Sequence, residues 1–395
     1  MDQIFFILQS VVGEAIAPAT AGVAIAVIGL NIHFGYTGLL NIGQAGFMLL
    51  GAYGMAISIT KGLPMVIAVL IGLLLALIFA TILGAPTLKL RGDYLAIVTI
   101  SAAEIIRYVG RLASLEGFTG GAQGIPGSQY SGPFRNLSFF GSGSWTLSPF
   151  NYETLGGSTA VRLLGLLVTI ALITVTVLFV RRTKLAGVAT RSPMADGLVI
   201  TGLVVLSLLA VLFTFPQTLT RTGVDGWWVR GVAWTVVLIC SLLVLLLVRS
   251  PWGRLLRGVR EDEEAMRSLG KNVFAVKMQA LIIGGMFGAL GGMVYVLAST
   301  VQADALARQI TFFAYTALLL GGAATIFGPV LGTVIFFGAR ILVREASRIY
   351  VPDSIIADNK TDVFSLMVVG VALMLLVVYR PQGILGDKRE LRFHV

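Results

Sequence analysis

The chain of 395 residues is 56% hydrophobic and only 12% charged, with a mean hydropathy of +0.91. Soluble domains carry about twice that fraction of charged residues, so this composition excludes a soluble globular protein. The net charge of +10 would suggest nucleic-acid binding in a soluble protein, whereas in a membrane protein it is typical of basic cytoplasmic loops. One cysteine, Cys240, and two distant histidines, His33 and His394, exclude an internal disulfide and disfavour a metal site.

Apolar segments long enough to cross a bilayer recur along the whole chain. We expect an all-α polytopic membrane protein with about eleven membrane segments in one transmembrane domain over residues 1–395. In chain order the segments are 17–34, 43–60, 63–84, 92–111, 160–180, 197–215, 229–248, 275–298, 310–322, 328–343 and 363–379. The ninth and tenth are short and rich in glycine, which favours half-helices or a re-entrant hairpin. The N-terminus lacks the basic region of a signal peptide, so we expect it to be retained.

The distribution of Lys and Arg predicts the orientation in the membrane. An odd number of crossings, with the charged segment after 229–248 inside, puts the N-terminus outside and the tail 380–395 in the cytoplasm. The other basic residues that then lie inside are Lys89, Arg91, Arg181, Arg182, Lys184, Arg191, Arg380, Lys388, Arg389 and Arg392. The largest extracytoplasmic loop, 112–159, has few basic residues, as this orientation requires.

Residues 250–277 form the densest run of charge, between two long apolar segments. A basic segment in that position is expected on the cytoplasmic surface. Within it Glu264, Ala265 and Met266 precede Gly270, a residue type that commonly ends helices. We interpret residues 250–274 as a segment that presents a short helix to a soluble motor protein.

Glycine clusters interrupt the apolar pattern in each half of the chain. One cluster, 35–46, contains Gly38, Asn41 and Gln44, and the other begins at Gly321 and Gly322. Broken helices at membrane depth are tolerated only where they are buried in protein or line a cavity. A translocation path between the two regions and ordinary helix packing are both open interpretations. The eighth segment carries a small-residue face, typical of close packing, at Gly284, Gly285, Gly288, Gly291 and Gly292.

The fourth segment contains the charged residues that matter most. Asp93 stands at its start, where a carboxylate can cap the helix or contact substrate, and Tyr94 follows it. Glu104 is a functional candidate because it is an acid within the membrane. Arg107, three residues further on, offers Glu104 a structural partner on the same helix face. We keep Asp93, Tyr94 and Glu104 as candidates for a translocation path.

The sequence contains no phosphate loop of the form G-x-x-x-x-G-K-[ST], no H-E-x-x-H helix and no G-x-S-x-G elbow. We therefore expect no catalytic residue, and no cofactor or metal bound by this chain. Few acids besides Glu104 are available for an ion-driven cycle. The energy for transport is expected to come from another chain.

Three blocks of sequence carry a family resemblance. They are GYTGLLNIGQAGFMLLGAY at 35–53, LRGDYLAIVTISAAEIIRYV at 90–109, and SPWGRLLRGVREDEEAMRSLGKNVFAVK at 250–277. Thr119, Gly120 and Gly121 follow the second block, and 321–322, 327–332 and 380–386 follow the third. Together they cover about half of the chain and resemble the LivM-type permease subunits of branched-chain amino acid ABC importers.

The resemblance implies a permease domain that pairs with a homologous LivH-like subunit in a bacterial cytoplasmic membrane. It also implies two cytoplasmic subunits that bind ATP and Mg²⁺, and an extracytoplasmic substrate-binding protein. By the same resemblance residues 250–274 dock onto the ATPase, with apolar contacts from Leu255, Val259 and Met266. The residues implied in this coupling are Arg254, Arg257, Arg260, Glu261, Asp262, Glu263, Glu264, Ala265 and Gly270.

This chain departs from the family pattern in one respect. We expect three segments between the outer loop and the third block, where the family has one, so an extra pair lies within 160–228. The function expected from the resemblance is import of branched-chain or related hydrophobic amino acids. Import of urea or short amides, a self-sufficient ion-coupled transporter and a membrane scaffold are the alternatives.

Overall fold

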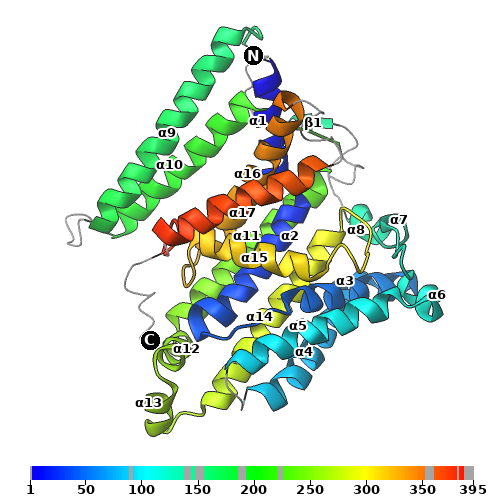
Figure 1. The fold of residues 1–395 in the computed structure, drawn as a ribbon. Helices are drawn as coiled ribbons and strands as arrows, with labels where there is room; N and C mark the ends of the chain where they lie inside the picture. Colours follow the sequence, from blue (N-terminus) through cyan, green and yellow to red (C-terminus); the bar gives the residue numbers. More distant parts are fainter. Residues whose placement is uncertain are drawn as a thin grey trace. The chain divides into compact units, whose positions relative to one another are not determined.

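The computed structural model describes residues 2–88, 92–137, 144–146, 155–185, 193–220, 226–351, 360–379 and 382–386, most of them in helices. A helix lies at each of the predicted membrane segments, which confirms the helical fold (Figure 1). Five helices among the described residues are long and apolar enough to cross a membrane: Pro18–Tyr36, Met65–Thr87, Thr159–Phe179, Trp227–Arg249 and Val273–Val296. The cytoplasmic basic residues predicted at Lys89, Arg91, Arg191 and Arg380, and at 388–392, lie outside the described residues, as do the side chains of Arg181, Arg182 and Lys184.

The chain divides into two compact units, Met1–Gly13 with Gly141–Gly223, and Glu14–Phe140 with Val224–Val395. In the first unit α9 (Thr159–Leu185) and α10 (Pro193–Thr214) form a hairpin (Figure 1). Hydroxyl pairs join the two helices, Thr169 with Thr214 at 3.4 Å and Thr176 with Ser207 at 3.2 Å. This hairpin lies within 160–228, where the sequence analysis places an extra pair of segments; that the family lacks such a pair stays a prediction.

The N-terminal helix α1 (Asp2–Ala15) is an element that the sequence analysis did not predict. Gln217 Nε2 donates to the carbonyl of Gln9 at 3.1 Å, and Gln9 Nε2 donates to the carbonyl of Pro216 at 3.2 Å. A short antiparallel ribbon, β1 (Ser144–Thr146) with β2 (Thr218–Thr220), belongs to the same unit. These reciprocal amide contacts hold α1 against the residues that precede β2. The apolar part of the helix, Gln3–Ala15, is too short to predict a membrane segment from hydropathy.

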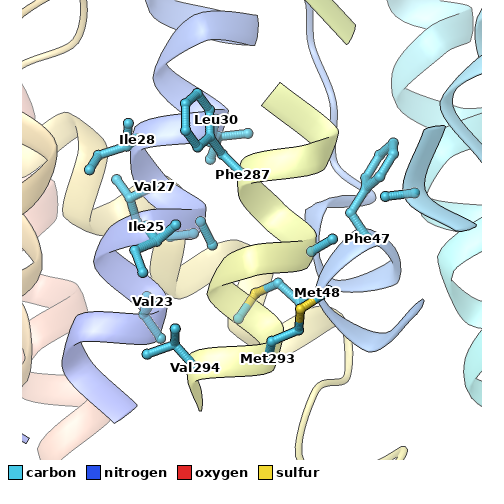
Figure 2. Close-up of a cluster of buried hydrophobic side chains, with 14 of the residues drawn as sticks. Val23, Ile25, Val27, Ile28, Leu30, Phe47, Met48, Phe287, Met293 and Val294 are labelled. Atoms are coloured by element: carbon cyan, nitrogen blue, oxygen red, sulfur yellow. The ribbon is translucent and has the colours of Figure 1, made fainter. Parts of the chain in front are cut away.

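The second unit is built around α2 (Pro18–Leu30), which is buried along nearly its whole length. Figure 2 shows its side chains packed against α14 (Val273–Val296) and, beyond it, α3 (Gln44–Thr60). The backbones come close because glycines face each other: a Cβ on Gly22 would lie 2.7 Å from the carbonyl oxygen of Gly291. Small residues at such contacts are what allow membrane helices to pack tightly. The predicted small-residue face of the eighth segment is thus confirmed.

The remaining long helices surround this core. They are α4 (Met65–Thr87), α5 (Gly92–Arg111), α11 (Trp227–Arg249), α15 (Arg308–Gly321), α16 (Gly328–Tyr350) and α17 (Thr361–Tyr379). With 14 residues α15 is about 21 Å long, too short to cross a hydrocarbon core of about 30 Å. The helix at the tenth segment is longer than the predicted apolar stretch 328–343, because α16 extends over 23 residues. Charged residues after 339 lowered the hydropathy of its second half and concealed its length.

The loop between α5 and residue 137, which the sequence analysis places outside, is folded into short helices, α6 (Glu116–Thr119), α7 (Gly127–Tyr130) and α8 (Gly132–Asn136). The hydroxyl of Tyr130 lies 2.6 Å from the carbonyl oxygen of Val296 and 2.7 Å from that of Ser299, at the end of α14. Burial raises the pKa of this phenol, so it stays protonated and able to donate. The loop is therefore anchored to the helices of the second unit.

Candidate coupling and translocation site

The charged segment folds into two short helices separated by a single extended residue. Pro251 occupies the first turn of α12 (Pro251–Glu261), where its missing N–H leaves no hydrogen bond unmade. Asp262 has an extended backbone, and its carboxylate accepts from the N–H groups of Glu264 at 2.9 Å and Ala265 at 3.0 Å. This cap starts α13 (Glu263–Ser268) and fixes the bend between the two helices.

Gly270 ends α13 in a left-handed conformation, with φ +72°. Its N–H donates to the carbonyl of Arg267 at 2.9 Å, and the N–H of Lys271 donates to that of Met266 at 3.1 Å. These two bonds form a Schellman motif, which satisfies carbonyls that the helix end leaves free. The predicted glycine cap is confirmed.

One face of α12 packs onto the protein and the other is exposed. Leu256 and Val259 are 1% and 2% exposed. The prediction that Val259 contacts a partner is therefore wrong in this structure, because spacing along a helix does not tell which protein covers the apolar face. Of the predicted coupling residues, the exposed ones are Arg254, Arg257, Glu261, Asp262, Glu264, Ala265 and Gly270.

The other two predicted coupling residues point toward the protein. Glu263 pairs with Lys277 of α14. Arg260 Nη1 donates to the carbonyl oxygen of Gly35 at 2.5 Å, and its side-chain stem lies against Gly38, whose φ is +75°. Gly35 belongs to a π-helical turn, η1 (Asn31–Tyr36), which continues α2. The hydrogen bond from Arg260 to Gly35 therefore joins the charged segment to the π-helical turn at the end of α2.

A buried hydrogen-bond network occupies the first glycine cluster. His33 Nε2 lies 3.1 Å from the carbonyl oxygen of Leu281, and its Nδ1 lies 3.1 Å from the side-chain nitrogen of Asn41. A carbonyl only accepts, so Nε2 carries the proton and Nδ1 accepts from Asn41. Asn41 also donates to Gln44 Oε1 at 3.0 Å, and Gln44 Nε2 donates to the carbonyl of Ala26 at 3.1 Å. Asn41 and Gln44 are fully buried, so in this conformation they hold helices together, and their role in a path stays a prediction.

Hydroxyl groups in neighbouring helices complete this network. Thr99 of α5 accepts from the N–H of Ile42 at 3.1 Å, and Thr311 of α15 accepts from that of Ala45 at 2.9 Å. Both satisfy N–H groups near the start of α3 that have no partner within the helix. The sequence analysis missed these two threonines. Their only signal is a hydroxyl within an apolar segment, which is too common to single out.

Asn31 connects the two glycine clusters. Its Nδ2 donates to the carbonyl of Thr325 at 2.7 Å, and its Oδ1 accepts from the N–H of Ala324 at 2.8 Å. Ala324 has a φ of +59°, a conformation that residues with a side chain rarely adopt. The breaks predicted in the two halves of the chain thus meet at one side chain, which the sequence analysis did not identify.

Gly321 and Gly322 end α15 and receive a segment from near the C-terminus. The N–H of Ile384 donates to the carbonyl of Leu320 at 2.9 Å, and the N–H of Leu385 donates to that of Gly321 at 3.0 Å. Gly322 has a φ of +109° and lies against the backbone of Gly386. Residues 382–386 therefore satisfy carbonyl groups that the helix end leaves free.

The candidates on α5 lie apart from these breaks. The side chain of Asp93 lies outside the described residues, and Tyr94 is 54% exposed. The predicted pair of Glu104 and Arg107 is confirmed, with 2.9 Å between Oε2 and Nη2. Asp304, in the connection between α14 and α15, adds a second carboxylate 2.6 Å from Arg107 Nη1. Glu104 thus belongs to an ion network that joins α5 to that connection.

Comparison with known proteins gives consistent similarities. The family model described as branched-chain amino acid transport system / permease component matches residues 14–197 and 198–378. The high-affinity branched-chain amino acid transport system permease protein LivM of Escherichia coli is 27% identical over 365 residues, which cover 92% of this chain and 67% of that protein. The probable LivM protein of Methanocaldococcus jannaschii is 29% identical over 40% of this chain and 46% of its own length.

A guanosine ABC transporter permease protein, NupQ of Bacillus subtilis, is 35% identical over 115 residues, which cover 27% of this chain and 34% of that protein. No solved structure shows significant similarity to the chain.

Proposed function

Because this chain belongs to the branched-chain amino acid transport permease family, a family of multi-pass membrane permeases, we propose that it forms half of the translocation path of an ATP-driven importer. The proposed substrates are branched-chain or related hydrophobic amino acids. The chain itself performs no catalysis in this proposal: ATP and Mg²⁺ are bound by partner subunits.

The bend of α12 and α13 is the observation that carries the proposal. Its exposed face presents charges of both signs, with Arg254 and Arg257 on α12 and Glu264 on α13. Both ends of α13 are capped, so the segment keeps its shape without a partner. A preorganised helix binds with a smaller loss of conformational entropy than a flexible loop, which suits a docking element.

A series of hydrogen bonds can transmit movement of this segment to the membrane helices. A displacement of α12 pulls on the carbonyl of Gly35 through Arg260, and Asn31 lies in the same π-helical turn. Asn31 then passes the displacement to the connection between α15 and α16. Closure of the ATPase subunits on nucleotide is the proposed source of the movement.

The proposed assembly contains this chain, a LivH-like second permease subunit, two cytoplasmic ATP-binding subunits and an extracytoplasmic binding protein. In this assembly the N-terminus lies outside, and α12, α13 and the C-terminal tail face the cytoplasm of a bacterial cell. The contacts of Arg107 with Asp304 and of Arg260 with Gly35 support the alternating order of helix ends that this topology requires.

Reconstitution tests the proposal. The chain and its candidate partner subunits are placed in proteoliposomes with ATP inside, and uptake of labelled L-leucine, L-isoleucine and L-valine is measured with the binding protein added outside. Urea, acetamide and guanosine serve as competing substrates, the last because of the relative that carries guanosine in its printed name. ATP-dependent uptake of the amino acids supports the proposal. Uptake by the chain alone, driven by an ion gradient, refutes it.

A further inference from the structure

The outer loop contains a tight turn, Thr119–Gly124, that the coupling mechanism does not use. Gly120, Gly121 and Gly124 have φ values of +75°, +58° and +74°, which residues with a side chain rarely adopt. A Cβ on Gly121 would lie 3.3 Å from Cγ of Glu116, so the glycine leaves room for the stem of that acid. The turn therefore depends on glycine both for its backbone and for the position of Glu116.

Within the second unit, the turn is held by hydrogen bonds to the residues that follow α14. Ile125 and Val301 exchange backbone hydrogen bonds of 2.9 and 3.0 Å. Gln302 Nε2 donates to the carbonyl of Ala122 at 3.2 Å. A loop held in this way is preorganised, because little conformational freedom is left to lose when a ligand binds.

A cavity of about 500 Å³ opens between this turn and the end of α3. Its volume falls in the range of small-molecule sites. The side chains that line it include Lys61, Glu116, Phe118, Gln123, Ile125 and Gln129. The lining thus combines one cation, one anion, two neutral amides and apolar surface.

The two opposite charges of the cavity do not neutralise each other. Across the described parts of the chain, neither Lys61 nor Glu116 forms an ion pair. Lys61 Nζ instead lies 5.3 Å from the centre of the Phe118 ring, a distance typical of a cation–π contact. A ligand that carries both a carboxylate and an ammonium group has a partner for each charge at this site.

We propose that this cavity is a binding site for the zwitterion of a free α-amino acid at the extracytoplasmic end of the permease. Lys61 binds the carboxylate, Glu116 binds the ammonium group, and Phe118 and Ile125 contact an apolar side chain. The choice of an amino acid rests on the proposed function, whereas the pairing of two charges rests on the cavity alone. In the transport cycle the site holds substrate that has left its carrier and has not yet entered the path.

Ligand binding is measured on the full chain in lipid nanodiscs by saturation-transfer NMR. Three probes separate the two charges: L-leucine has both, L-leucinamide has only the ammonium group and 4-methylpentanoate has only the carboxylate. The variants are Lys61→Gln and Glu116→Gln, which keep the side-chain stems. Arg308→Gln is the matched control, because Arg308 is an exposed cation outside the cavity.

Each variant is expected to weaken L-leucine binding about fivefold, as for the loss of one exposed ion pair. Lys61→Gln weakens binding of 4-methylpentanoate and leaves binding of L-leucinamide unchanged. Glu116→Gln weakens binding of L-leucinamide and leaves binding of 4-methylpentanoate unchanged. Arg308→Gln changes the binding of neither probe. Equal binding of all probes to all variants overturns the proposal. The proposal is also overturned if the cavity variants lose only the docking of the binding protein, while their binding of free L-leucine is unchanged.

Uptake by the reconstituted wild-type transporter is measured in parallel. The results can then contradict the cavity proposal and the proposed function separately. If L-leucine is imported with ATP while the cavity variants bind it like the wild type, only the cavity proposal falls. If the cavity binds L-leucine and no ATP-driven uptake occurs, only the proposed function falls.

Discussion

Arg260 and Gly35 stand 225 positions apart in the sequence, yet Nη1 of the arginine donates a hydrogen bond of 2.5 Å to the carbonyl oxygen of the glycine. The arginine belongs to α12, and the glycine to the π-helical turn at the end of α2. Hydrogen bonds from charged groups contribute about 1.5–3 kcal/mol, more than most surface contacts. This contact therefore links the proposed docking segment directly to the first helix break.

Replacing Arg260 with glutamine is expected to uncouple ATP hydrolysis from transport. The shorter, neutral side chain loses the bond to Gly35, whereas the exposed docking face stays intact. ATPase activity of the assembled complex should stay within about twofold of wild type, while amino acid uptake per ATP falls about tenfold, as expected for about 1.4 kcal/mol. Arg254→Gln, on the exposed face, is the matched comparison and should weaken binding of the ATPase. Unchanged coupling in Arg260→Gln contradicts the prediction.

Replacing Gly270 with alanine tests the glycine cap of α13. A left-handed conformation costs a residue with a side chain about 1–2 kcal/mol, so the last turn of α13 should fray. Binding of the ATPase, followed by co-purification, should fall several-fold, and Gly270→Asn should be milder because asparagine tolerates this conformation better.

Gly62→Ala is the control for Gly270→Ala. Gly62 has a φ of +87°, and the space around both glycines is open. The backbone cost is therefore of the same kind, but Gly62 lies far along the chain from the docking segment. Loss of ATPase binding in both variants would show that general destabilisation, and not the shape of α13, causes the effect.

Replacing Asn31 with leucine is expected to destabilise the junction between the two helix breaks. The N–H of Ala324 and the carbonyl of Thr325 would lose their partner, and an unsatisfied buried group costs about 1–3 kcal/mol. The Tm of the detergent-solubilised protein should fall by several degrees. Asn136→Leu changes the same residue type at an exposed position and should leave the Tm nearly unchanged. A similar Tm for wild type and Asn31→Leu would contradict the role of this side chain.

Replacing Glu104 with glutamine distinguishes a structural acid from a proton carrier. Arg107 keeps Asp304 as a partner at 2.6 Å, so ATP-driven uptake should stay within about twofold of wild type. A carrier that moves protons through Glu104 would instead lose transport and its dependence on the pH gradient. Uptake is measured with and without that gradient. Abolished uptake in Glu104→Gln, with normal assembly, would favour the ion-coupled alternative.

Local features of the helices were predicted well, because they depend on residues that are near in sequence. The glycine cap at Gly270 follows from backbone preference, and the Glu104–Arg107 pair follows from helical spacing. The direction in which side chains face was not predictable in the same way. Val259 fits an apolar docking stripe by spacing, but it packs inside the protein.

The sequence by itself determined that a helix lies at each long apolar segment, that α14 has a small-residue face, and which family the chain belongs to. Apolar length, glycine spacing and motif order are properties of continuous stretches of sequence, so they can be recognised without knowledge of the fold. Only the tertiary structure decided that Asn31 meets Ala324, that Arg260 reaches Gly35, and that Lys61 and Glu116 line one cavity. Each of these arrangements joins segments far apart in sequence. The two hydrogen bonds in addition depend on which backbone groups the packing leaves unsatisfied inside the membrane protein.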